Sequence, residues 1–362
     1  MFRIRSAETA RVRLRNRGVS RLSPLFFNLF DGALFRGWVS PSAGVAAQTE
    51  KFRMTILYSD LRFQEHLTGR HPESPQRLVA VLDHLAQQKL GDQCKKGEFT
   101  FASQEQLQSV HTAAHVRRVE DYVAGGGGRI EQDTVCSPKS WDAARLAAGA
   151  GISAVDAVLK GLDKTALCLV RPPGHHALAG SPMGFCLFNN VAIAARHAIA
   201  VHKLRRVLIV DWDVHHGNGT QDIFYRDEQI YFLSAHRFPF YPGSGDANET
   251  GAGPGSGTKF NLPLAYGIPR KEFLTRFEST LSQAADKCRP ELILLSAGFD
   301  AHREDPVGSL SLETEDFGKL TDLVKQVAQA SCGGKIVSLL EGGYNTQRLA
   351  ESVGLHLERL LA

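Results

Sequence analysis

Short apolar runs, most of them continuous rather than alternating, recur along the chain from residue 54 onward. A continuous apolar run indicates a strand that is covered on both faces, as in a parallel sheet. The predicted strands span residues 54–59, 165–170, 206–211, 229–235, 291–297 and 335–341. Helical patterns lie between them, at residues 141–160, 187–203, 271–288, 313–330 and 346–361. Strands that alternate with helices predict a single-domain α/β fold: a doubly wound, mostly parallel sheet with helices on both faces.

Four of the predicted strands run directly into residues that bind metal ions or transfer protons. TALCLV leads into RPPGHH, VLIVD into WDVHHGN, ELILLSAG into FD, and IVSLLEGG into Y. In open parallel sheets, ligands bind beyond the carboxyl ends of the strands, where successive loops converge. The sequence therefore predicts one site at that edge, built from His175, His176, Asp211, Asp213, His215, Asp300 and Tyr344.

Three of these residues form a predicted metal site. Asp213 and His215 lie two residues apart on an extended segment, so their side chains point to the same side and can share an ion. Asp300 is the third predicted ligand. Three nitrogen and oxygen ligands leave one position open, as in catalytic zinc sites, so Zn²⁺ is expected and Fe²⁺ is the alternative. Two carboxylates balance the charge of the ion and leave its bound water less acidic, so a partner base is needed.

His175 and His176 are the predicted bases. Asp211 and Asn218 flank the ligands and are the available acceptors that could orient the two imidazole rings. Tyr344 follows two glycines that allow a close approach of the backbone, and its hydroxyl could donate to a developing oxyanion. The combination indicates metal-assisted hydrolysis of an amide.

Five segments resemble motifs of the histone deacetylase superfamily: RPPGHHA, GFCLFNN, DWDVHHGNGTQDIF, SAGFDAHREDPVG and LEGGYN. This superfamily includes bacterial acetylpolyamine amidohydrolases and acetoin-utilisation proteins. The similarity covers about residues 54–362, which implies an arginase/deacetylase-like fold. HPESPQRL (71–78) and SPKSWDAARLAAG (137–149) resemble the class II branch. Several motifs in the family's order are far more specific than a lone HH or DxH.

The resemblance implies roles for the predicted residues. Its zinc ligands fall on Asp213, His215 and Asp300, and its paired histidines fall on His175 and His176, the second being the expected base. Asp211 falls on the acceptor behind the first histidine, and Asn218 stands where class I enzymes have Asp. Tyr344 matches the tyrosine that stabilises the transition state. Asp211 and Ser234 fall on the family's structural potassium site, so K⁺ is expected as well.

The resemblance also implies a substrate tunnel. Gly184 matches the residue whose carbonyl accepts the substrate amide N–H. Phe185 and Tyr241 would line a narrow passage for an acylated, lysine-like chain, and Asp133 is placed at its rim, where it could hold a peptide backbone. We therefore expect a zinc-dependent deacetylase that acts on N-acetyl-lysine in a protein or peptide, or on a similar acetylated amine.

Three alternatives remain at this point. The first is an acetylpolyamine or other small-molecule amidohydrolase, although Val307 stands where polyamine-selective relatives have an acidic gatekeeper. The second is a ureohydrolase, which needs further aspartates for two manganese ions that DWDVHHGN does not supply. The third is an inactive acyl-lysine binder, against which Tyr344 and the complete ligand set argue.

Charge divides the chain at its N-terminal segment. The first 50 residues hold eight arginines, no lysine and three acidic residues, whereas the remainder holds 34 basic and 35 acidic residues. Residues 1–53 are therefore either an organelle transit peptide, which would direct the protein to a mitochondrion or plastid, or an extension outside the fold of a cytoplasmic protein. The catalytic domain is expected to be residues 54–362. We expect no direct nucleic-acid binding and no membrane span, and the oligomeric state stays open.

Overall fold

The computed structural model describes residues 54–362, so the predicted N-terminal extension lies outside the described residues. The strands are β1 (Ile56–Ser59), β2 (Lys95–Lys96), β3 (Gly128–Arg129), β4 (Val135–Cys136), β5 (Thr165–Leu169), β6 (Val207–Asp211), β7 (Ile230–Arg237), β8 (Lys259–Leu264), β9 (Leu292–Ala297) and β10 (Ile336–Leu340). Eight of them form one sheet in the order β2-β1-β5-β10-β9-β6-β7-β8, and every pairing in it is parallel. Strands β3 and β4 form a separate antiparallel pair.

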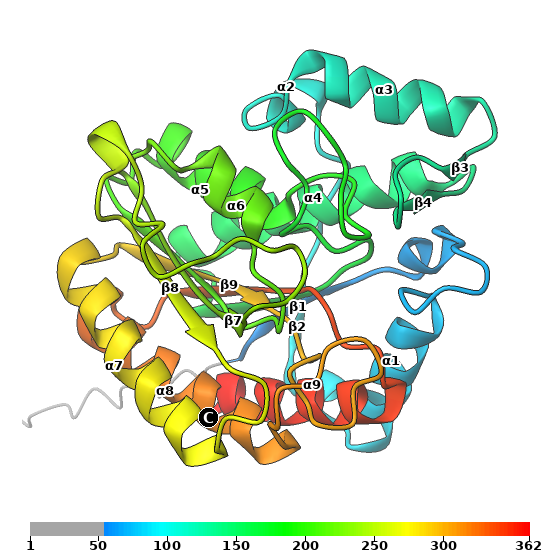
Figure 1. The fold of residues 1–362 in the computed structure, drawn as a ribbon. Coiled ribbons are helices and arrows are strands. Elements are labelled where there is room, and N and C mark those ends of the chain that lie inside the picture. The colour runs from blue at the N-terminus through cyan, green and yellow to red at the C-terminus, as the bar shows by residue number, and fades with distance from the viewer. Residues whose placement is uncertain (1–53) are drawn as a thin grey trace, which may run out of the picture. The chain divides into compact units, whose positions relative to one another are not determined.

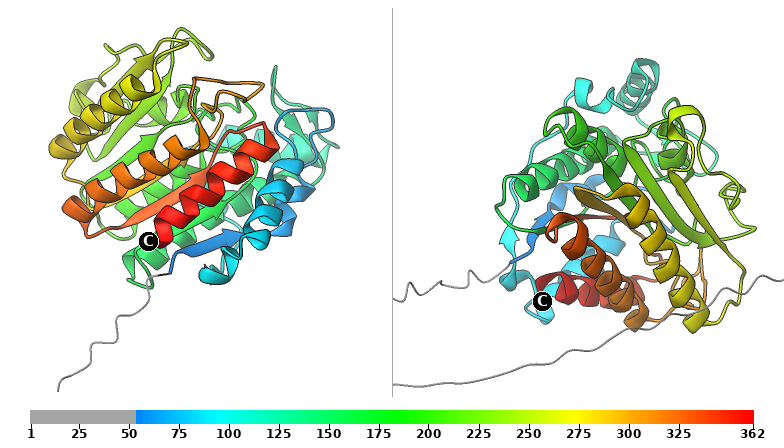
Figure 2. Two further views of the ribbon diagram at one scale, coloured as in Figure 1. Left: turned by 90° about the horizontal axis from the view of Figure 1, so that it is seen from below. Right: turned by 90° about the vertical axis from the view of Figure 1, so that its left-hand side faces the viewer.

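Helices cover both faces of the large sheet, as Figures 1 and 2 show. They are α1 (Gln76–Gln87), α2 (Gln104–Leu107), α3 (Ala113–Ala124), α4 (Ser140–Leu159), α5 (Asn190–Ala200), α6 (Asn218–Ile223), α7 (Arg270–Cys288), α8 (Thr314–Cys332) and α9 (Thr346–Leu361). Helices α4 and α5 pack together over one face, while α7, α8 and α9 lie on the other. Every residue of β5, β6, β9 and β10 is buried, which explains their continuous apolar runs.

The predicted α/β architecture is confirmed, and the six predicted strands and five predicted helices are all present. Strand β8 was not predicted. It lies at the edge of the sheet, contains both buried and half-buried residues, and includes Pro263, so it lacks a continuous apolar run. Helices α1 and α3 were also missed. In the described part of the chain, no helix combines the length and the apolar character that crossing a bilayer requires.

Candidate active site

The four strands that lead into the predicted site residues are neighbours in the sheet, in the order β5-β10-β9-β6. Because all four are parallel, the loops after them emerge at the same edge. The structure therefore brings together the side chains that the sequence predicted to converge.

Asp213, His215 and Asp300 form a compact group that we call the strand-edge cluster. The Nδ1 atom of His215 lies 3.0 Å from Oδ1 of Asp213 and 3.1 Å from Oδ2 of Asp300. One ligand atom from each residue lies within 4.8 Å of the other two, and all three residues are buried. The backbone holds the remaining carboxylate oxygens: the N–H of Gly342 donates to Oδ2 of Asp213, and that of Val214 donates to Oδ1 of Asp300.

The electrostatics of this cluster suit a bound cation. Oδ2 of Asp300 is buried and accepts no well-aligned hydrogen bond from the described residues, although Nδ1 of His215 lies 3.1 Å away. Burial, followed by the carboxylate of Asp213, raises the pKa of Asp300 to about 7. Burial opposes a charge on His215, yet the two carboxylates raise its pKa to about 9. A buried oxygen that lacks a well-aligned hydrogen bond, beside an imidazole and a second carboxylate, fits a divalent ion with mixed nitrogen and oxygen ligands.

Two glycines allow the backbone to lie against the cluster. A Cβ atom at Gly342 would lie 2.3 Å from Oδ2 of Asp300 and 2.5 Å from Oδ2 of Asp213. A Cβ atom at Gly298 would lie 2.1 Å from Oδ2 of Asp213. Any side chain at either position would displace a carboxylate, so the glycines of SAGFD and LEGGYN are part of the site.

The two histidines of RPPGHH have different partners, as predicted. Nδ1 of His175 lies 3.0 Å from Oδ2 of Asp211, and Nδ1 of His176 lies 2.7 Å from Oδ1 of Asn218. Burial alone would lower the pKa of His175, but the carboxylates of Asp211 and Asp213 raise it to about 10. Burial and the neighbouring His175 and His215 hold the pKa of His176 well below its usual value. His176 is therefore the neutral member of the pair, able to accept a proton.

Tyr344 is held from two sides. Its ring packs edge-on against Phe185, with centroids 5.8 Å apart, and the guanidinium of Arg77 lies 5.1 Å from its centroid. Burial raises the pKa of the Tyr344 hydroxyl well above its usual value, so the group stays protonated and can donate. The Tyr344 backbone N–H donates to Asp305 at 2.6 Å, which fixes the turn after β10.

The residues predicted for substrate contact also lie at this edge. The Tyr241 ring is 5.3 Å from His176, and its side chain reaches the surface. A Cβ atom at Gly184 would lie 2.3 Å from the His176 ring, so glycine permits this approach. Oδ1 of Asp133 accepts the Gly184 N–H at 3.1 Å, so one oxygen of this carboxylate braces the wall of the predicted tunnel.

Asp211 and Ser234 are direct neighbours across strands β6 and β7, and both are buried. Oδ1 of Asp211 accepts the N–H of Asp213, and Oγ of Ser234 lies 2.9 Å from Nδ1 of His236. The potassium site expected at these two residues stays a prediction.

Sequence reasoning missed a buried charge network beneath the site. The Glu73 carboxylate lies 2.5 Å from Nε of Arg171 and 3.2 Å from a terminal nitrogen of Arg77. Arg77 in turn donates to the carbonyls of Gly343 and Glu341, on the turn that carries Tyr344. These side chains are fully buried, although charged residues usually lie at the surface.

Glu341 supports the histidine loop from the same direction. One of its oxygens accepts the backbone N–H groups of Gly174 and His175, at 2.6 and 3.2 Å. Burial raises its pKa to about 7. The carboxylate thus links the end of β10 to the loop after β5. In the sequence, the position of Glu341 within the LEGGYN motif was the one indication that it belongs to the site.

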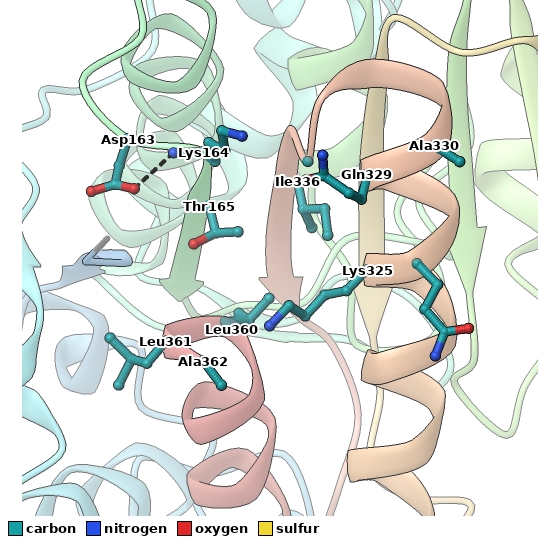
Figure 3. Close-up of a pocket in the computed structure, with 12 residues that line it drawn as sticks. Asp163, Lys164, Thr165, Lys325, Gln329, Ala330, Ile336, Leu360, Leu361 and Ala362 are labelled. Carbon is teal, nitrogen blue, oxygen red and sulfur yellow. Dashed lines mark hydrogen bonds between the residues drawn. The ribbon is translucent and has the colours of Figure 1, made fainter. Parts of the chain in front are cut away.

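A surface hollow lies at the other edge of the sheet, where strands β5 and β10 begin. Figure 3 shows it lined by Thr165, Ile336, the end of α8 and the C-terminal residues. None of the residues predicted for catalysis or metal binding contributes to it. The residue cluster at the carboxyl edge, rather than this hollow, is the candidate active site.

Three comparisons with known proteins agree with this geometry. A family model described as histone deacetylase domain matches residues 71–360. The chain is 39% identical over 315 residues to "Histone deacetylase 10, chloroplastic" of Oryza sativa subsp. japonica, across 82% of this chain and 71% of that protein. It is 41% identical over 301 residues to "Polyamine deacetylase HDAC10" of Homo sapiens, across 80% of this chain and 44% of that protein. The solved HD domain of HDA15 matches with a TM-score of 0.81 and 36% identity, covering 86% of this chain and 88% of that one, which confirms the arginase/deacetylase-like fold.

Proposed function

This chain belongs to the histone deacetylase family, and we propose that it is a zinc-dependent deacetylase of N-acetyl-lysine in proteins or peptides, or of a similar acetylated amine. The arrangement of the strand-edge cluster carries the proposal. His215 faces one oxygen from each of two aspartates, and the Asp300 oxygen is buried and accepts no well-aligned hydrogen bond from the described residues. Asp213, His215 and Asp300 would hold the metal, which would polarise the amide carbonyl and acidify a bound water.

The other side chains divide the proton transfers between them. His176 would take the proton from the attacking water, because it is neutral and its Nδ1 is held by Asn218. His175, paired with Asp211, would keep a positive charge beside it. Tyr344 would donate its hydroxyl to the oxyanion that forms when water oxygen bonds to the carbonyl carbon. The C–N bond then breaks, the proton passes from His176 to the leaving nitrogen, and acetate and a free amine are released.

Residue 307 bears on the charge of the substrate. Val307 is half-buried, and its backbone N–H donates to Asp305. Because the side chain at position 307 is apolar, it offers no carboxylate that could pair with a cationic polyamine. This favours acetyl-lysine. A polyamine deacetylase is the second candidate function, because a relative at 41% identity carries that name.

The test is acetate release by the full chain, loaded with zinc, from an acetyl-lysine peptide and from N-acetylputrescine in parallel. Cleavage of the peptide at the higher kcat/KM supports the favoured substrate. A higher kcat/KM for N-acetylputrescine would assign the polyamine as the substrate instead. Failure to release acetate from either would overturn the proposed activity.

We further propose that residues 54–362 form the catalytic domain and that residues 1–53 direct the protein to a plastid. The arginine-rich, acid-poor composition of the first 50 residues and the word "chloroplastic" in the name of the rice relative support this. Residues 1–53 fused to a fluorescent protein should accumulate in plastids of a plant cell. Accumulation in mitochondria or in the cytoplasm would contradict the proposal.

A further inference from the structure

A second group of metal-binding side chains lies where helices α4 and α5 end. Asp156 is in the last turn of α4, His197 is in the last turn of α5, and His202 follows the end of α5. Helix α5 begins next to the histidine loop, since the side chain of Asn189 donates to the carbonyl of Ala177. The group, which we call the helix-end cluster, is therefore separated from the strand-edge cluster by the length of α5.

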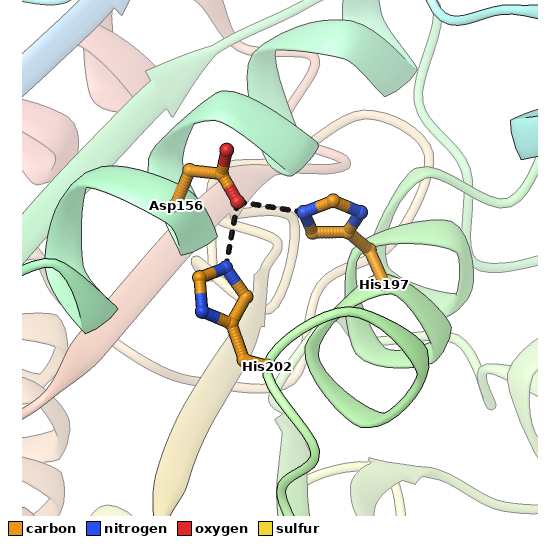
Figure 4. Close-up of side chains that lie close together, drawn as sticks. All are labelled: Asp156, His197 and His202. Atoms are coloured by element: carbon orange, nitrogen blue, oxygen red, sulfur yellow. Dashed lines mark hydrogen bonds and ion pairs between the residues drawn. The ribbon is translucent and has the colours of Figure 1, made fainter.

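The two imidazole rings converge on one carboxylate oxygen, as Figure 4 shows. Nε2 of His197 and Nε2 of His202 each lie 2.7 Å from Oδ1 of Asp156. The ring centroids are 5.6 Å apart, and the rings are nearly perpendicular. One ligand atom from each residue lies within 4.8 Å of the other two.

This donor set matches what a transition metal requires. At metal–ligand distances of about 2.0–2.1 Å, ligand atoms around a tetrahedral ion are roughly 3.3 Å apart. The N–O distances would therefore have to grow by about 0.6 Å, and both rings, which now point at the oxygen, would have to turn towards an ion between the three ligands. Two imidazoles and one carboxylate favour zinc, cobalt or nickel over magnesium or calcium. The side chains are 31%, 11% and 17% exposed for Asp156, His197 and His202, so an ion can enter from solvent.

The neighbouring charge is a lysine. Nζ of Lys160 lies 2.9 Å from Oδ2 of Asp156, and its side chain is 61% exposed. The ammonium therefore competes with a cation for the carboxylate but can swing into water when one binds. We propose that Asp156, His197 and His202 form a second site for a divalent transition-metal ion such as zinc. The bound ion would link the ends of α4 and α5 independently of the catalytic site.

The stoichiometry of bound zinc tests this site on the full chain. After equilibrium dialysis against micromolar zinc, the wild type should hold two ions per chain and the double variant His197→Gln, His202→Gln should hold one. His215→Ala, which breaks the strand-edge cluster, should also hold one. His84→Gln, a half-buried histidine on α1 outside both clusters, should hold two. One ion in the wild type, or an unchanged zinc content in the double variant, overturns the proposal.

A second variant gives a result that loss of folding cannot mimic. Lys160→Gln removes the competing ammonium and should tighten zinc binding about three- to tenfold in the His215→Ala background, as measured by titration against a chromophoric chelator. If the histidines only hydrogen-bond Asp156, this substitution leaves zinc affinity unchanged. That result would contradict a metal site here.

Discussion

The strand-edge cluster and the helix-end cluster use the same kinds of side chain but differ in how the protein encloses them. Asp213, His215 and Asp300 are at most 8% exposed at their side chains, and backbone N–H groups from other loops hold both aspartates. Asp156, the carboxylate of the helix-end cluster, is 31% exposed, and the described residues that hold it, Lys160, His197 and His202, do so with their side chains. Enclosure strengthens electrostatic interactions and keeps bulk water away, which suits a reaction. An exposed cluster suits an ion that only links two helices.

We expect acetate release to depend on the enclosed region, which holds the strand-edge cluster and the residues beside it. His176→Ala should lower kcat by about 10²- to 10⁴-fold because the proton acceptor is lost. Tyr344→Phe, which removes one oxyanion donor, should cost about 10²- to 10³-fold. Steady-state acetate release measures both, with His84→Gln as the control. Activity within threefold of wild type in either variant would break the assignment.

The buried charge network should make the enclosed region the costlier one to disturb. Glu73→Gln leaves Arg171 and Arg77 buried without their carboxylate, which typically costs about 3–5 kcal/mol. Urea unfolding of the metal-free protein measures this difference. Glu98→Gln, on an exposed residue, should change the unfolding free energy by less than about 0.5 kcal/mol. Equal effects of the two substitutions on the unfolding free energy would show that the network does not stabilise the fold.

Acid should weaken the same network. Burial raises the pKa of Glu73, but Arg171 and its other partners lower it to about 2, against an ordinary value of 4.5. A carboxyl with a depressed pKa stabilises the fold above its unfolded pKa, and that stability is lost as pH falls towards the folded pKa. The metal-free wild type should therefore lose roughly 3 kcal/mol from this group between pH 4.5 and 2. Glu73→Gln should show a correspondingly shallower pH dependence, and identical slopes would contradict the pairing.

The helix-end cluster should tolerate change best. His197→Gln removes one partly exposed contact to Asp156, so it should cost less than about 1 kcal/mol in the metal-free protein and leave kcat within twofold. Unfolding and acetate-release assays on the same preparation measure both. A loss of activity beyond tenfold would mean that the two clusters are not independent.

The sequence predicted the parts of the molecule that are specified locally. Strands β5, β6, β9 and β10 are buried on both faces, so their apolar runs are unbroken and the polar residues after them stand out. The family resemblance implied that Asp211 stands behind the first histidine, and the structure pairs His175 with Asp211 and His176 with Asn218.

The missed parts depend on contacts between distant segments. Glu73 and Arg171 are 98 residues apart, and each looks like an ordinary loop charge until the fold buries them together. Asp156 and His202 are 46 residues apart, and neither an aspartate on a helix nor a histidine just after one carries a local signal for a partner. Edge strand β8 was hidden by Pro263 and its half-exposed residues. Tertiary packing rather than local pattern decides all of these.

Zinc-dependent recovery of acetate release tests the central claim most directly. Full-length protein stripped with a chelator should be inactive on an acetyl-lysine peptide, and zinc added in excess of both clusters should restore acetate release. Asp300→Asn should stay inactive at the same zinc concentration, while the double variant His197→Gln, His202→Gln should recover. Activity that persists after the metal is removed, or that returns in Asp300→Asn, would contradict a zinc deacetylase built on the strand-edge cluster.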